Sequence, residues 1–155
     1  RIKKLEDSLV LFFTGISRTA SEIAETQISN TPNKIKELDK MKQMVDQAVE
    51  ILCEESTPVD EFGKLLDESW KIKRSITQKI STDLIDSVYD RGINAGALGG
   101  KLLGAGGGGF IMFFTTPNNK QWSIAPPETI RRTDAGYAAP PRKLVPRRQR
   151  PRGVC

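Results

Sequence analysis

The stretch that decides the fold is residues 99–114, GGKLLGAGGGGFIMFF, in which a glycine-rich segment leads into an apolar run. Residues 110–114 (FIMFF) are apolar at every position, which is typical of a central strand with both faces buried. The run stops at residues 115–117 (TTP). The glycines at 104–109 therefore join two strands or form a phosphate-type loop between them.

Residues 104–109 also match the dinucleotide-binding pattern G-x-G-x-x-G, but the context differs. That pattern must open a helix whose N-terminus faces the pyrophosphate, whereas an apolar strand follows here. No Gly-Lys-Ser/Thr follows, so the loop is not a Walker A loop.

The number of glycines is itself informative. A hairpin turn is served by two or three glycines, and residues 99–109 contain seven. Because each glycine costs ordering entropy on folding, the excess favours a backbone that must approach a ligand or another domain closely. A flexible hairpin connection is the alternative interpretation, and residue types alone do not choose between the two.

Upstream of this stretch, a strand is followed by helices. Residues 9–13 (LVLFF) are a short run of strand formers and predict a buried strand. Thr19 and Glu22 have capping-box spacing, which predicts a short helix with Ile23, Ala24 and Ile28 on one face.

Three further helices are expected before the glycines. Thr31-Pro32 and Thr57-Pro58 each have the residue types of a helix start, with proline at the first helical position. Apolar residues follow at spacings of three and four, through Leu52 in the first helix and Trp70 in the second. Residues 81–83 (STD) open the last helix, which Gly92 or Gly96 ends. The predicted order of one strand, several helices and then two strands around the glycines indicates an α+β fold.

Composition excludes several classes of protein. The 155 residues include no histidine, which removes the Ser-His-Asp and Cys-His mechanisms and the usual zinc motifs. No apolar run reaches the roughly 18 residues that span a membrane, and residues 1–7 do not have the pattern of a signal peptide. We therefore expect a cytoplasmic protein with no membrane span.

The C-terminal part has a different composition from the rest. Residues 120–155 carry nine lysines and arginines against two acidic residues, and six of the nine prolines. Such a segment does not make a packed core, so we expect a domain over residues 1–119 and a Pro/Arg-rich, disordered tail over residues 120–155.

The segment from Gly99 to Phe110 closely resembles the third conserved motif of the GHMP kinases, named for galactokinase, homoserine kinase, mevalonate kinase and phosphomevalonate kinase. Residues 11–18 (LFFTGISR), 60–70 (DEFGKLLDESW) and 95–98 (AGAL) resemble the branch that acts on D-glycero-D-manno-heptose 7-phosphate and related sugars. The resemblance spans about residues 1–119. It implies a C-terminal domain with a ferredoxin-like α+β sandwich and additional helices.

The resemblance also implies a function. The family transfers a phosphoryl group from ATP, with Mg²⁺, to a sugar hydroxyl. Here it implies that the backbone of Gly104, Ala105, Gly106, Gly107, Gly108 and Gly109 forms part of the ATP and substrate cleft. Ser17, Arg18 and Lys101 are candidate contacts to the sugar-phosphate substrate, although a surface arginine and a solvated lysine are the alternative interpretations. Trp70 is more typical of the core than of a sugar platform.

Other parts of the family pattern are missing from this sequence. The main phosphate loop, Pro-x-x-x-Gly-Leu-Gly-Ser-Ser, and the catalytic acid belong to an N-terminal domain, so we expect a C-terminal fragment that is inactive alone, holds no ATP or Mg²⁺ by itself and needs that domain as its partner. The acidic pairs at 60–61 and 67–68 fall on helix starts and helix faces, where a structural role is the expected one. No catalytic or metal-binding set is therefore expected in the chain.

After Pro117 the family continues with a helix and a final strand, so we expect the fold to be incomplete there, by a frame change, a truncation or a fusion. Without that strand, residues 9–13 would form an open apolar edge prone to self-association.

Two interpretations of another class remain open. The basic tail would attract nucleic acid or anionic surfaces electrostatically, although Trp122 and Tyr137 are its only aromatic residues for base stacking. Alternatively, residues 35–70 would be a helical interaction module. Neither interpretation explains the glycines between apolar strands.

Overall fold

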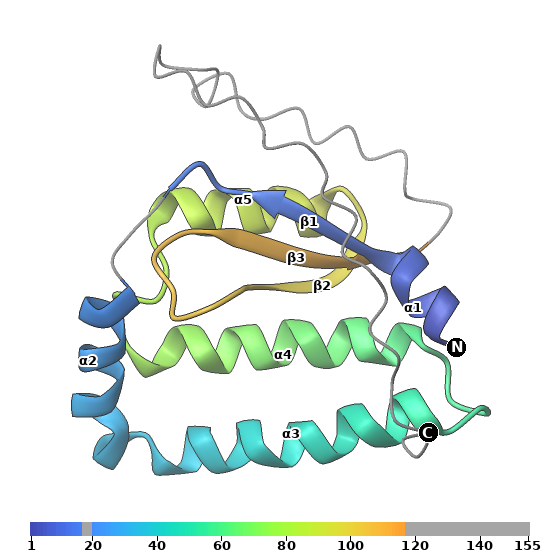
Figure 1. Cartoon of the computed structure of the whole chain (residues 1–155), viewed down its shortest axis with the longest axis horizontal. Helices are drawn as coiled ribbons and strands as arrows, with labels where there is room; N and C mark the ends of the chain where they lie inside the picture. The colour runs from blue at the N-terminus through green and yellow to red at the C-terminus, as the bar shows by residue number, and fades with distance from the viewer. Residues whose placement is uncertain (17–19, 117–155) are drawn as a thin grey trace, which may run out of the picture. The chain divides into compact units, whose positions relative to one another are not determined.

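The computed structural model describes residues 1–16 and 20–116 as a layered α+β unit (Figure 1). The expected α+β class is confirmed. Ser17, Arg18, Thr19 and the tail at 120–155 lie outside the described residues, as does the expected incomplete end of the fold. The helices and strands, in chain order, are α1 (Ile2–Ser8), β1 (Leu9–Phe13), α2 (Ala20–Asn30), η1 (Thr31–Asn33), α3 (Ile35–Cys53), α4 (Asp60–Ile76), α5 (Asp83–Asn94), β2 (Ala97–Leu102) and β3 (Phe110–Thr115).

The sheet of the described residues has the strand order β1-β3-β2. The central strand β3 is antiparallel to both neighbours, with Met112 opposite Leu11 of β1 and Lys101 of β2. β1 and β2 are consequently parallel, and the helices between them form the crossover. This arrangement fits the expected ferredoxin-like sandwich with additional helices, and the prediction that residues 110–114 form a central strand is confirmed.

Helices pack on both faces of β3. Successive side chains of a strand point to opposite faces, so neighbouring residues of β3 meet different helices. Phe113 packs against Tyr89 of α5, with ring centroids 5.8 Å apart, whereas Phe114 packs against Phe62 of α4 at 6.2 Å. Both phenylalanines are fully buried. In Figure 1 α4 lies between the sheet and α3, which makes α3 an outer layer. Trp70 of α4 is also fully buried, as expected of a core residue.

Two glycines let β2 lie directly against α4. A Cβ atom on Gly99 of β2 would stand 2.0 Å from the carbonyl oxygen of Gly63 in α4. A Cβ on Gly63 would in turn meet the Phe114 ring at 2.6 Å. Part of the glycine excess seen in the sequence is therefore explained by the packing of a helix on a strand.

The helix starts agree only partly with the sequence. Residues 81–83 open α5 as expected, and Thr82 is the residue that caps it, since its hydroxyl accepts a hydrogen bond from the Ile85 N–H at 3.4 Å. The prediction that Thr31-Pro32 begins the long helix is wrong, because these residues form the separate turn η1 and α3 begins at Ile35. Helix α1 was not expected from the sequence. The last helix ends at Asn94, and Gly96 follows with a φ of 102°.

Candidate functional site

The glycine loop, residues 103–109 between β2 and β3, is fixed to the rest of the domain by its own backbone. The Gly107 N–H donates to the Ile80 carbonyl at 2.8 Å, and the Gly109 N–H donates to the Ile16 carbonyl at 2.9 Å. The N–H and the hydroxyl of Thr14 both donate to the Gly109 carbonyl, each at 2.9 Å. These bonds tie the loop to the end of β1 and to the turn before α5, so its shape does not depend on a ligand.

Two loop positions need glycine because the chain itself comes close. A Cβ on Gly106 would stand 2.8 Å from the Ile80 Cα, and one on Gly108 would stand 2.6 Å from the Ile16 carbonyl oxygen. Gly104 differs, because no described atom lies within 4 Å of where its Cβ would stand, although its φ of 79° favours glycine. Gly104 therefore leaves the loop open on one side.

The backbone donors of the loop divide into two groups. Within residues 104–109, the N–H groups of Gly107 and Gly109 are bonded to the chain's own carbonyls. Those of Gly104, Ala105, Gly106 and Gly108 have no hydrogen-bond partner among residues 1–16 and 20–116. Unpaired backbone N–H groups in successive turns form a concave surface that favours an anion. The loop can offer such a surface without any charged side chain.

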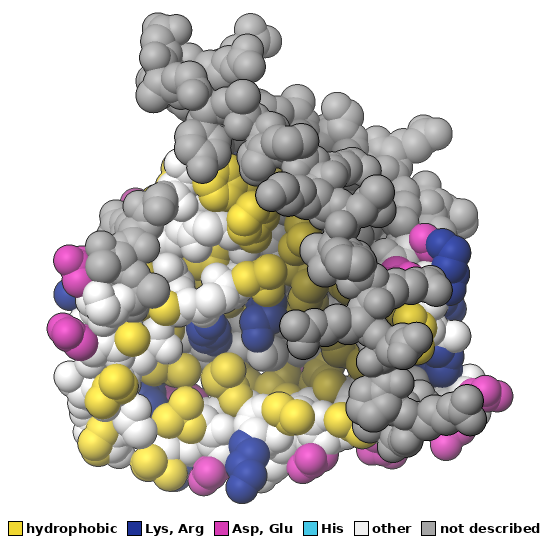
Figure 2. Space-filling model, viewed as in Figure 1, with side chains coloured by type: hydrophobic (Ala, Val, Ile, Leu, Met, Phe, Trp, Pro, Cys, Tyr) yellow, Lys and Arg dark blue, Asp and Glu magenta, His cyan; other side chains and the backbone are white. Residues whose placement is uncertain are grey.

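Two lysines add positive charge near this loop. Lys73 of α4 donates from its ammonium to the Gly104 carbonyl at 2.5 Å. Burial, and then the neighbouring charge of Lys101, lower the pKa of Lys73, and burial lowers the pKa of Lys101. In the described part of the chain no carboxylate forms an ion pair with either lysine. Figure 2 shows Lys or Arg side chains among hydrophobic ones at the centre of this face.

Lys73 was missed by the sequence analysis. It lies 31 residues before Gly104 on the polar side of a helix, and no sequence pattern links the two positions. Its contact with the loop depends on how α4 packs under β2.

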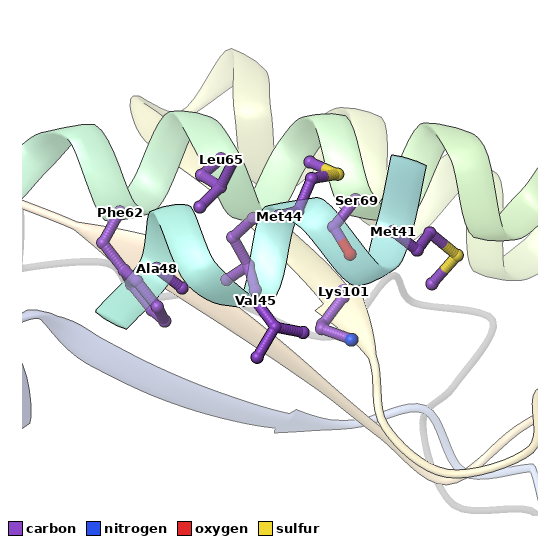
Figure 3. A pocket seen from close by; sticks show the side chains of 9 residues that line it. Met41, Met44, Val45, Ala48, Phe62, Leu65, Ser69 and Lys101 are labelled. Carbon is purple, nitrogen blue, oxygen red and sulfur yellow. The ribbon is translucent and has the colours of Figure 1, made fainter. Parts of the chain in front are cut away.

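Lys101, predicted as a substrate contact, lines a pocket between α3 and α4 (Figure 3). We call it the methionine pocket. Its volume is about 180 Å³, and its other lining residues are apolar except for one serine: Met41, Met44, Val45, Ala48, Phe62, Leu65, Leu66 and Ser69. A sugar is recognised mainly through hydrogen bonds to its hydroxyls, and Ser69 and Lys101 are the only side chains of this lining with groups that form them. The substrate role of Lys101 stays a prediction, as do those of Ser17 and Arg18.

The acidic residues of α4 make structural contacts. The Asp67 carboxylate accepts hydrogen bonds from the Tyr89 hydroxyl and from the Lys71 ammonium, both at 2.6 Å. Glu61 pairs with Lys64 at 2.7 Å. Over the described residues, no three His, Cys, Asp or Glu side chains gather in an arrangement that could hold a metal ion. Nor does any described helix have the length and apolar character to cross a bilayer.

Residues 48–121 match the family model described as "GHMP kinases C terminal". The chain is 35% identical over 120 residues to a D-glycero-alpha-D-manno-heptose 7-phosphate kinase of Campylobacter jejuni, a match that covers 76% of this chain and 34% of that protein. It is 26% identical over 125 residues to a bifunctional fucokinase/GDP-fucose pyrophosphorylase of Arabidopsis thaliana, covering 77% of this chain and 11% of that protein. The chain thus spans about a third or less of the length of these relatives.

Solved structures give the same picture of the fold. The mevalonate kinase of L. major, solved with R-mevalonate, superimposes with a TM-score of 0.62 at 22% identity, over 72% of this chain and 35% of that one. The Methanococcus jannaschii mevalonate kinase superimposes with a TM-score of 0.58 at 25% identity, over 76% of this chain and 35% of that one.

Proposed function

Because this chain belongs to the GHMP kinase family, we propose that it is the C-terminal part of an ATP-dependent kinase that phosphorylates a sugar or sugar phosphate. The match to a heptose 7-phosphate kinase favours a heptose phosphate as the substrate class. The observation that carries the proposal is the glycine loop, which is fixed by its own hydrogen bonds and has unpaired N–H groups and an open side at Gly104.

The loop suits phosphoryl transfer because that reaction depends mostly on positioning and on neutralising charge. The four unpaired N–H groups at 104, 105, 106 and 108 would donate to phosphate oxygens. The Lys73 ammonium, beside the Gly104 carbonyl, would add positive charge at the same place. ATP would supply the phosphoryl group. Donors that are already in position need no rearrangement when negative charge develops.

The chain on its own does not provide a whole kinase site. No set of side chains that could hold Mg²⁺ occurs among the described residues, so we assign no step to a metal. An N-terminal kinase domain would supply the main phosphate loop and the catalytic acid, and it is the proposed partner. The expected cytoplasmic location and the expected binding of nucleic acid or anionic surfaces by the tail stay predictions.

Self-association is a second expected partnership. In the described sheet no strand pairs with the outer edge of β1. On the face of β1 and β3 away from α5, the side chains of Leu11, Phe13 and Phe110 are 61%, 50% and 48% exposed. An open strand edge beside exposed apolar side chains favours pairing with another chain.

The kinase proposal is tested with a chimera in which residues 1–116 replace the matched region of the Campylobacter jejuni heptose 7-phosphate kinase. We expect ADP formation that depends on heptose 7-phosphate, measured by a coupled assay. The variant Gly104→Ala should lower kcat/KM at least tenfold, because its Cβ would occupy the open side where phosphate approaches.

The control is Gly96→Ala at the end of α5. Its φ of 102° resembles the 79° of Gly104, so both alanines carry a similar backbone strain of about 1 kcal/mol. Equal losses of activity in the two variants, or a folded chimera with no sugar-dependent ADP formation, would contradict the proposal.

A further inference from the structure

The methionine pocket has a chemical character that the proposed kinase function does not use. Of the nine residues that line it, Lys101 is the only charged one, and Ser69 is the only other polar one. The side chains of Met41 and Met44 of α3 both contribute to its lining (Figure 3). Methionine is flexible and polarizable, which suits a binding surface for apolar groups.

The charge of Lys101 is unbalanced at this place. Its side chain is half-buried, and burial lowers its pKa because the ammonium loses contact with water. Within residues 1–16 and 20–116 it makes no ion pair and no side-chain hydrogen bond. The nearby charge of Lys73 is of the same sign. A half-buried ammonium of this kind is stabilised by an anion that reaches it.

The size of the pocket limits the ligand. Its volume of about 180 Å³ compares with the ~150 Å³ apolar cavity that takes up one benzene molecule. An apolar group of five or six carbons therefore fits, whereas a nucleotide or a long acyl chain does not.

We propose that the methionine pocket binds a small amphiphilic anion: a short apolar group that packs against Met41, Met44 and Phe62, with one carboxylate or phosphate that pairs with Lys101. Ser69 also lines the pocket, and its hydroxyl would donate a second hydrogen bond to the anionic group. None of the residues that line the pocket belongs to the glycine loop, although Lys101 lies close enough to Lys73 for their charges to interact, and the proposed binding does not depend on ATP.

The probe for this site is hexanoate, and hexanamide is the matched neutral compound of the same size and shape. The 155-residue chain is labelled with [methyl-¹³C]methionine, so that Met41 and Met44 report from the pocket wall. We expect both methyl signals to shift saturably with hexanoate, at the millimolar affinity usual for a ligand of about eight heavy atoms. Hexanamide should bind about tenfold more weakly, since it lacks the charge-assisted hydrogen bond.

Two variants locate the interaction. Lys101→Met keeps the apolar stem and removes the charge, so hexanoate should then bind no better than hexanamide. Lys64→Met is the control, because Lys64 lies on α4, one of the two helices beside the pocket, but does not line the pocket and is exposed and paired with Glu61. Hexanoate affinity should stay within twofold of the original in this variant. Ala48→Leu should fill the pocket and abolish binding of both compounds.

Three results would overturn the proposal: no shift of Met41 and Met44 with 20 mM hexanoate, equal affinity for hexanoate and hexanamide, or unchanged hexanoate affinity in Lys101→Met. The comparison of hexanoate with hexanamide uses the unaltered chain, so it decides the question even where a variant fails to fold. Activity of the heptose kinase chimera is measured separately, and its loss leaves this test unaffected.

Discussion

Replacing Gly99 with alanine tests whether the glycine excess serves the packing of β2 on α4. The new Cβ would stand 2.0 Å from the Gly63 carbonyl oxygen, and 2.8 Å from the Asp67 backbone nitrogen. Real Cβ atoms do not come closer than 3.0 Å to such atoms. The obstacle is helix backbone, which cannot rotate away as a flexible side chain can. The strand and the helix must therefore separate by about 1 Å.

The energetic cost follows from what that separation disturbs. Leu66 of α4 and Phe114 of β3 are buried in one hydrophobic cluster beside this contact, and both would lose close packing. Overpacking a protein core costs about 1–3 kcal/mol, and a clash with backbone lies at the upper end of that range. We expect Gly99→Ala to lower the free energy of unfolding by about 3 kcal/mol. With an m value of about 2 kcal/mol/M, the urea midpoint would fall by ~1.5 M.

The assay is urea unfolding followed by far-UV circular dichroism and by tryptophan fluorescence. Gly104→Ala is the matched comparison, because its Cβ meets no described atom and only its φ of 79° is strained, at a cost of about 1 kcal/mol. If Gly99→Ala proves no more destabilising than Gly104→Ala, the close contact between β2 and α4 is wrong.

Two further changes test other parts of the structure. Burial, followed by the hydrogen bond to Asp67, raises the pKa of Tyr89 well above its usual range, so this tyrosine stabilises the fold below pH 10 and its contribution falls as pH rises further. Tyr89→Phe should therefore cost about 1–2 kcal/mol at pH 8 and progressively less toward pH 11.5 in urea unfolding; a pH-independent difference would refute this. Leu11→Lys places a charge on the open edge of β1 and should lower the average mass of the chain in sedimentation equilibrium. A chain that is monomeric at high concentration before the change would argue against self-association through this edge.

Much of the fold follows from local patterns in the sequence. The apolar run at 110–114 predicts a central strand because strands buried on both faces typically lack polar positions. β3 is the central strand of the described sheet, although Phe110 at its start is half-exposed. Residues 81–83 predict the start of α5 because short polar side chains can accept a hydrogen bond from an N–H in the first turn, and Thr82 does so. A local pattern can also mislead. Thr31-Pro32 has the residue types of a helix start, yet these residues form the separate turn η1, and α3 begins after it at Ile35.

Some features of the candidate site follow from the sequence, and others depend on the tertiary structure. The sequence by itself determined that residues 104–109 form a glycine loop between strands, and that the chain belongs with the GHMP kinases, because both depend on residues adjacent in the chain. Only the tertiary structure decided which glycines serve packing and which leave the backbone open. Gly99 faces Gly63 of a helix, whereas no atom of residues 1–16 or 20–116 comes within 4 Å of the Cβ position of Gly104. It also brought Lys73 to the loop and Lys101 to the methionine pocket. Periodicity shows which side of a helix or strand is apolar, but the neighbour it meets is set by the packing of elements distant in the chain.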